Sequence, residues 1–118
     1  MNFGSWFPLD DALAAAPELP GVLQARADAL CAYPKGRTAM LLYARCRPQE
    51  TLRRYVATRG AAPLSRAAKL GARWIRFGTS PRPEVEFERL LGRFSERFGA
   101  NPTGNDDDDD QEARSRDG

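Results

Sequence analysis

The chain has 118 residues, of which 42% are hydrophobic and 29% charged, and it contains no histidine. This length fits one domain with a modest core, and no apolar run approaches the roughly 18–20 residues that a membrane span needs. The N-terminal stretch lacks the features of a signal peptide, so we expect a cytoplasmic protein with no membrane partner. The absence of histidine excludes the residue that most often serves as a general base and as a zinc ligand. The two cysteines, Cys31 and Cys46, are expected to be free thiols.

Charge is divided unevenly along the chain. Residues 1–105 hold 16 basic and 9 acidic residues, whereas residues 106–118 hold 2 basic and 7 acidic ones. Fourteen of the 16 basic residues in residues 1–105 are arginine, the residue best suited to bidentate contacts with phosphate. The alternative explanation for this number is an arginine-rich composition without a dedicated phosphate-binding surface. We expect a folded domain over residues 1–102 and a disordered acidic tail over residues 103–118. The run Asp106–Asp110 is expected to be solvated, with occupation of the basic surface as the alternative.

Hydrophobic periodicity predicts the elements of the first half. Apolar residues at helical spacing predict a helix over residues 9–16, which ends at a proline. A strand over residues 22–27, a ten-residue loop over 28–37 and a second strand over 38–44 follow. Because the second strand is almost wholly apolar, we expect it in the centre of a sheet with both faces covered.

The second half predicts two helices, a strand and a final helix. The helices cover residues 48–58 and 63–70, and each begins near a proline and ends near a glycine. A strand over residues 72–78 is rich in β-forming residues. The last helix carries one apolar stripe and ends at Gly99; the stripe consists of Phe87, Leu90, Leu91, Phe94 and Phe98. The expected fold is therefore α/β, with a small three-stranded sheet flanked by helices.

This order of elements, with several short motifs, resembles the GIY-YIG nuclease family over residues 17–102. Pro20-Gly21-Val22-Leu23 is similar to the segment that opens the family's first strand, and Leu42-Tyr43-Ala44-Arg45-Cys46 resembles a degenerate form of the segment that ends its second strand. The remaining matches are Leu52-Arg53-Arg54 in the following helix, Glu88-Arg89-Leu90-Leu91 around the family's metal-binding glutamate, and Asn101 or Asn105 at its closing asparagine.

The resemblance implies metal-dependent hydrolysis of phosphodiesters. In that scheme Glu88 would hold a Mg²⁺ or Mn²⁺ ion and Arg53 would steady the phosphate, while tyrosines position the attacking water. This chain departs from the family at the tyrosines, because Leu23 replaces the first and Leu42 the second. Tyr43 is adjacent, but a one-residue offset points it to the other face of the strand unless a bulge intervenes. We therefore expect weak or no nuclease activity.

Three hypotheses for the function stay open. The first is a degenerate domain that binds nucleic acid, DNA in preference to RNA, through Arg45, Arg47 and either Arg53 or Arg54. The second is an active metal-dependent endonuclease that uses Glu88. The third is a non-catalytic module that meets a protein partner.

Several other side chains have structural interpretations. Trp74 is expected in the core, with stacking on a nucleic-acid base as the alternative. Cys46 is expected to be a packed thiol, because the histidine that usually activates a nucleophilic cysteine is absent from this chain. Glu84 and Glu88 lie beside the apolar stripe, where they face either the sheet or the solvent. Glu86 is expected on the solvated face of the helix.

Overall fold

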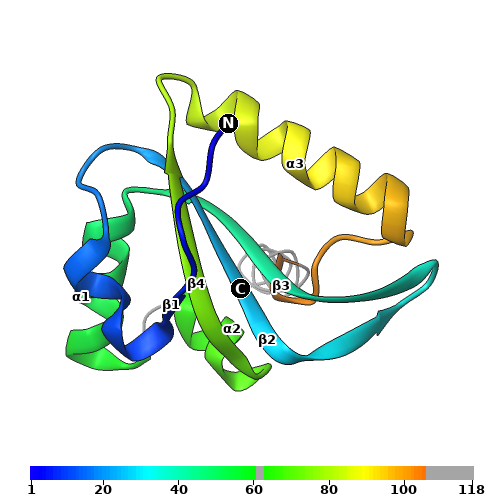
Figure 1. The fold of residues 1–118 in the computed structure, drawn as a ribbon, viewed down its shortest axis with the longest axis horizontal. Helices are drawn as coiled ribbons and strands as arrows, with labels where there is room; N and C mark the ends of the chain where they lie inside the picture. The colour runs from blue at the N-terminus through cyan, green and yellow to red at the C-terminus, as the bar shows by residue number, and fades with distance from the viewer. Residues whose placement is uncertain (61–62, 106–118) are drawn as a thin grey trace, which may run out of the picture.

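The computed structural model describes residues 1–60 and 63–105, which form an antiparallel sheet flanked by helices (Figure 1). The strand order is β1-β4-β2-β3, so the expected three-stranded sheet was wrong by one strand. Among the described residues, no helix is both long enough and apolar enough to cross a membrane. The elements in chain order are β1 (Phe7–Pro8), the 3-10 helix η1 (Leu9–Ala15), β2 (Gly21–Tyr33), β3 (Gly36–Cys46), α1 (Pro48–Thr58), α2 (Leu64–Lys69), β4 (Ala72–Thr79) and α3 (Pro83–Phe98).

The hairpin of β2 and β3 is longer than predicted. In place of a ten-residue loop over 28–37, the strands continue to a two-residue turn at Pro34 and Lys35. Tyr33 explains the extension, because its ring packs against Phe94 and Phe98 of α3, with centroid distances of 5.1 and 5.9 Å. The Lys35 amide also donates to the Phe98 carbonyl at 2.9 Å. These contacts join residues about 60 positions apart, so the local sequence does not reveal them.

The expected central position of the second strand was wrong. β2 is central and pairs with both β3 and β4, whereas β3 lies at the edge of the sheet. Asn105 meets this edge: its Oδ1 accepts from the Tyr43 amide at 3.0 Å and its Nδ2 donates to the Tyr43 carbonyl at 2.9 Å. The folded part thus continues through Asn105, so residues 103–105 belong to the domain. The rest of the expected disordered tail, residues 106–118, lies outside the described residues.

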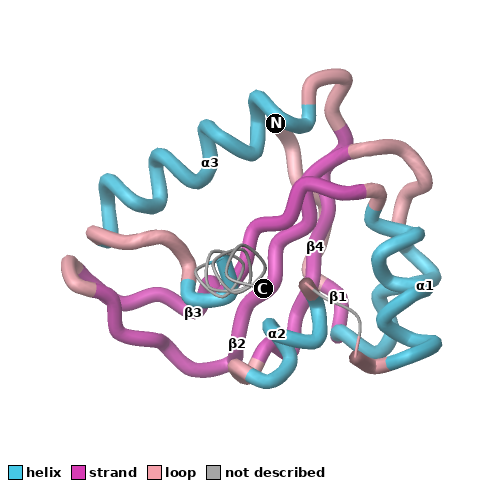
Figure 2. The backbone as a smooth tube through the Cα atoms, turned by 180° about the vertical axis from the view of Figure 1, so that it is seen from behind, coloured by secondary structure: helices cyan, strands magenta, loops and turns pink. Residues whose placement is uncertain are grey.

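Side chains of the central strand alternate between two cores on opposite faces of the sheet. Leu23 and Ala25 pack into the larger core with residues of η1, α1 and α2, while Val22 packs with Tyr43 and Phe94 on the side of α3. Figure 2 shows the same arrangement from behind, with α3 on one side of the strands and α1 and α2 on the other. A single site that combined residues of α1 and α3 would therefore have to extend from one face of the sheet to the other.

Gly21 at the start of β2 has a steric role. A side-chain carbon at this position would collide with the carbonyl oxygen of Gly78 in β4. The glycine of the Pro20-Gly21 pair thus allows the backbones of two neighbouring strands to approach closely.

Asn105→Ala tests the edge contact. The change leaves the amide and carbonyl of Tyr43 without partners in a buried position, and we expect the free energy of unfolding to fall by about 2–3 kcal/mol. Urea denaturation measures this loss. Asn101→Ala is the control, because Asn101 is only half-buried and the change is expected to cost less than about 0.5 kcal/mol. Equal losses in the two variants would contradict the role given to Asn105.

The raised pKa of Tyr43 is expected to make the stability of the fold depend on pH in the alkaline range. Burial raises the pKa of Tyr43 above its ordinary value of 10.0, although the charge of Arg76 opposes the rise. The unfolded chain therefore loses this proton from about pH 10 while the folded chain still holds it, so stability should fall as the pH rises above 10. Tyr43→Phe keeps the ring and removes the proton, and should make the urea midpoint less dependent on pH above 10. An unchanged alkaline slope would refute this assignment.

Candidate functional site

All four arginines expected to bind nucleic acid are exposed on the segment that runs from the end of β3 into α1. Arg45 and Arg47 are exposed at the end of β3, and Arg47 also donates to the Glu18 carbonyl at 3.4 Å. Arg54 is exposed on α1 near Cys46: burial raises the pKa of this thiol, while a hydrogen bond from Thr51 and the charge of Arg54 oppose the rise. We call Arg45, Arg47 and Arg54 the junction arginines. Cys46 itself is packed, with a pKa unsuited to a nucleophile.

Arg53 and Glu88, the expected catalytic pair, do not come together. Arg53 is exposed on α1 and Glu88 is exposed on α3, and these helices pack against opposite faces of the sheet. In residues 1–60 and 63–105, no group of three or more Cys, Asp or Glu side chains is arranged to hold a metal ion. Glu84, one turn before Glu88, is also exposed, so both glutamates face solvent. The metal role of Glu88 stays a prediction.

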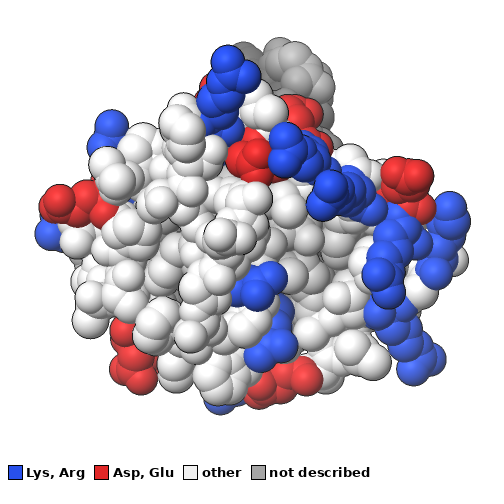
Figure 3. Space-filling model, turned by 45° about the horizontal axis from the view of Figure 1, so that its top comes forward, with Lys and Arg blue, Asp and Glu red and all other residues white. Residues whose placement is uncertain are grey.

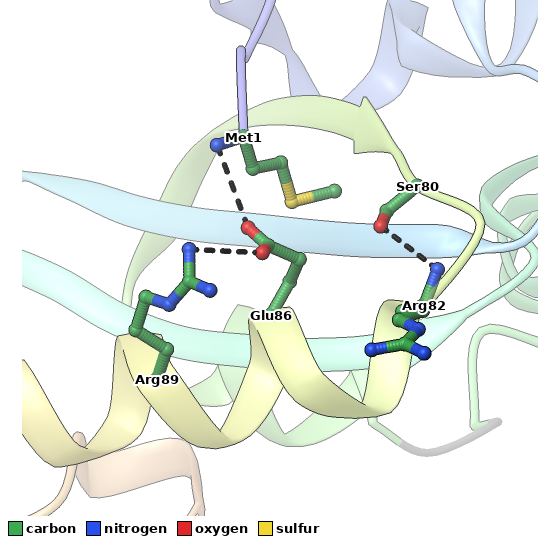
Figure 4. A network of polar contacts seen from close by, with 5 residues as sticks. All are labelled: Met1, Ser80, Arg82, Glu86 and Arg89. Carbon is green, nitrogen blue, oxygen red and sulfur yellow. Dashed lines mark hydrogen bonds and ion pairs between the residues drawn. The ribbon is translucent and has the colours of Figure 1, made fainter.

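Glu86 does not lie on a solvated face, as had been expected. Its side chain is 14% exposed and bridges two cations: the Met1 amino nitrogen lies 3.4 Å from Oε2, and Arg89 Nη1 lies 3.0 Å from Oε1 (Figure 4). The N-terminal segment crosses from β1 to α3 here, since a side-chain carbon at Gly78 would contact Asn2 and Met1. The periodicity of α3 could not reveal this covering segment.

The tyrosine and the two leucines of the degenerate motifs lie on different faces. Leu23 and Leu42 are fully buried in the larger core, whereas Tyr43 packs on the α3 side with its ring 5.9 Å from Phe94. A bulge does occur at Leu41, between the pairs Ala25–Leu42 and Arg26–Met40. The raised pKa of Tyr43 is the opposite of what a group that takes a proton from water at neutral pH requires.

A second basic group, which the sequence reading did not single out, lies on the α3-side face of β2 and β4. The guanidinium carbons of Arg26 and Arg76 lie 4.4 and 4.5 Å from the ring centroid of Trp6. Arg76 Nε donates to Gln24 Oε1 at 2.6 Å. We call Arg26 and Arg76 the sheet-face arginines. The alternation of Gln24 with Arg26, and of Trp74 with Arg76, was the available signal, because residues two apart share a face.

Burial and the repulsion between the two sheet-face arginines affect the pKa of Arg76. Burial lowers the pKa of Arg76 and the charge of Arg26 lowers it further, whereas Tyr43 opposes the shift. Trp74, expected in the core, is instead only half-buried, and its indole nitrogen donates to Asp28 Oδ1 at 2.5 Å. Both members of the pair are guanidinium groups positioned by aromatic rings.

Charged side chains are unevenly spread over the surface. On the face drawn in Figure 3, basic side chains form a band along one side, with acidic side chains interspersed, next to a broad area without charge. The band is not uniformly positive, which agrees with the outer side of α3, where exposed Glu88 and Glu96 accompany Arg89, Arg93 and Arg97. The positive charge of this face is therefore interrupted by carboxylates.

Comparison of the chain with protein-family models, with curated proteins and with solved structures finds no significant match.

Proposed function

We propose that this chain is a nucleic-acid-binding module that contacts phosphates through the junction arginines and does not cleave its ligand. The observation that carries the proposal is the exposure of all three side chains on the segment that runs from the end of β3 into α1. None of the three forms an ion pair with a carboxylate of the described residues. Arginine without a protein counterion is suited to bidentate contacts with phosphate.

Binding of this kind is largely independent of sequence, because phosphate contacts carry affinity but no base information. The excess of 16 basic over 9 acidic residues in residues 1–105 adds long-range attraction for a polyanion. We propose DNA as the preferred ligand over RNA. Arg53, the exposed neighbour of Arg54 on α1, is a peripheral contact in this proposal.

The absence of cleavage in this proposal is supported by three positions. Leu23 and Leu42 are buried apolar side chains where the resemblance implies tyrosines. Glu88 lies across the sheet from Arg53, so the two would not readily act on one phosphate. A metal-bound hydroxide at Glu88 remains the alternative mechanism, and it is tested separately below.

Replacing two junction arginines tests the binding surface. If Arg45 and Arg54 each contact a phosphate, the double variant Arg45→Met/Arg54→Met should reduce the slope of log affinity against log salt concentration by about 2. Fluorescence anisotropy with a labelled DNA duplex, at four or more salt concentrations, measures the slope.

The matched control for this experiment is Arg37→Met/Arg93→Met, which removes the same charge from exposed positions on the hairpin and on α3. It should weaken binding slightly at low salt and leave the slope unchanged. Equal reductions in the two double variants would mean that net charge, and not the junction, determines binding. Failure of the wild type to bind at low salt would refute the proposal.

Cleavage assays test the second half of the proposal. We expect no cutting of supercoiled plasmid, branched DNA or single-stranded RNA with Mg²⁺ or Mn²⁺, by the wild type or by Glu88→Ala. Gel electrophoresis of the products is the measurement, and Glu84→Ala is the control because Glu84 is an exposed carboxylate of the same helix. Cutting that disappears in Glu88→Ala but persists in Glu84→Ala would instead establish the metal-dependent nuclease.

A further inference from the structure

The sheet-face arginines leave polar groups without protein partners. The Nε of Arg26 is buried and makes no hydrogen bond to any described residue. Buried donors in proteins are nearly always satisfied, and an orphaned one calls for an explanation such as a bound ligand or water. Arg76 uses its Nε for Gln24, and no described residue accepts a hydrogen bond from its terminal nitrogens.

Two like charges also lie over the same indole ring with no ion-pair partner among the described residues. Neither Arg26 nor Arg76 forms an ion pair within residues 1–60 and 63–105, and the charge of Arg26 helps to lower the pKa of Arg76. The nearby carboxylate of Asp28 is occupied by the indole of Trp74. Repulsion of this kind is relieved when an anion binds between the two guanidinium groups.

The surrounding rings orient the pair and add a flat apolar surface. Trp6 lies over both guanidinium groups, and Phe3 lies 4.9 Å from that of Arg76. Stacking on an aromatic ring restricts the plane in which an arginine can donate. The half-buried Trp74 lies beside Arg26, since these two residues are directly paired between β4 and β2.

We propose that Arg26 and Arg76 form an oxyanion site for the phosphate group of a nucleotide, with Trp74 contacting the base. The ligand is either a free nucleotide or a unit of a single strand, because both carry this phosphate and a flat ring. The site uses other residues than the junction arginines and goes beyond the function proposed for them.

Intrinsic fluorescence reports directly on this site, because Trp6 and Trp74 are the only two tryptophans of the chain. The probes are inorganic phosphate, thymidine monophosphate and a hexamer of thymidine nucleotides, each added to the full-length chain at low salt. We expect saturable quenching by the monophosphate, the hexamer or both. Binding of the monophosphate as tight as that of the hexamer identifies a free nucleotide, and binding of the hexamer alone identifies a strand.

Arginine variants decide whether the signal comes from this pair. Arg26→Met and Arg76→Met should each raise the dissociation constant at least about tenfold, because each removes charged hydrogen bonds to the phosphate. Arg73→Met is the matched control: it lies in the same strand and is exposed, and its dissociation constant should match the wild type. Circular dichroism and thermal melting establish that each variant is folded.

Conservative variants keep the test decisive if a methionine variant does not fold. Arg26→Lys and Arg76→Lys retain the charge but lose the planar fork, so binding should weaken several-fold. The proposal is overturned if these variants bind like the wild type, if no probe quenches the fluorescence, or if inorganic phosphate alone does so.

The junction double variant Arg45→Met/Arg54→Met separates this site from the proposed function. Its quenching by the monophosphate or the hexamer should match the wild type even where its duplex binding is lost. Loss of the quenching in this variant would show that the response does not arise at the sheet-face pair, and would overturn the inference while leaving the junction surface supported.

Discussion

The structure depends on the double pairing of β2. Residues Gly21 to Ala25 pair with β3 on one side and β4 on the other, and all five are buried. A strand held along both edges cannot shift its register without moving every side chain to the wrong face. This constraint sends Leu23 to the larger core and Val22 to the core under α3, and it also aligns Gln24 and Arg26 on the face where Arg76 lies. The hydrophobic arrangement and the arginine pair thus have one origin.

The same two-sided arrangement keeps the residues of the expected catalytic site apart. α1 contributes to the larger core and α3 to the smaller one, so arginines of α1 and glutamates of α3 point into solvent on different sides of the sheet. The family resemblance implied a single site that combines both helices. In this chain the arginines instead form two groups, one at the end of β3 and one on the open part of the sheet beside the N-terminal segment. The two groups differ in environment, since the first is exposed and the second lies against the indole ring of Trp6.

Local periodicity was sufficient to predict some elements but not others. The stripe that includes Phe94 and Phe98 predicted α3, and the helix over 48–58 was predicted with its observed bounds, because each has a strong amphipathic pattern and a proline at its start. The outer half of the hairpin was missed because Tyr33 is held by residues of α3, far away in sequence. Arg45 and Arg47 could be identified from their place after an apolar strand. The pair of Arg26 with Arg76 could not, since it requires the knowledge that β2 and β4 are neighbours.

Asn105 also has a consequence for how molecules of this protein behave toward one another. A free strand edge is a template on which a second chain can build, and one feature at each side of this sheet interrupts that template. β1 at one side is only two residues long, and at the other side the Asn105 amide occupies the Tyr43 backbone groups as a neighbouring strand would. A chain truncated before this residue would present β3 to other molecules. Its characteristic failure would then be concentration-dependent self-association through strand pairing, and not loss of the fold alone.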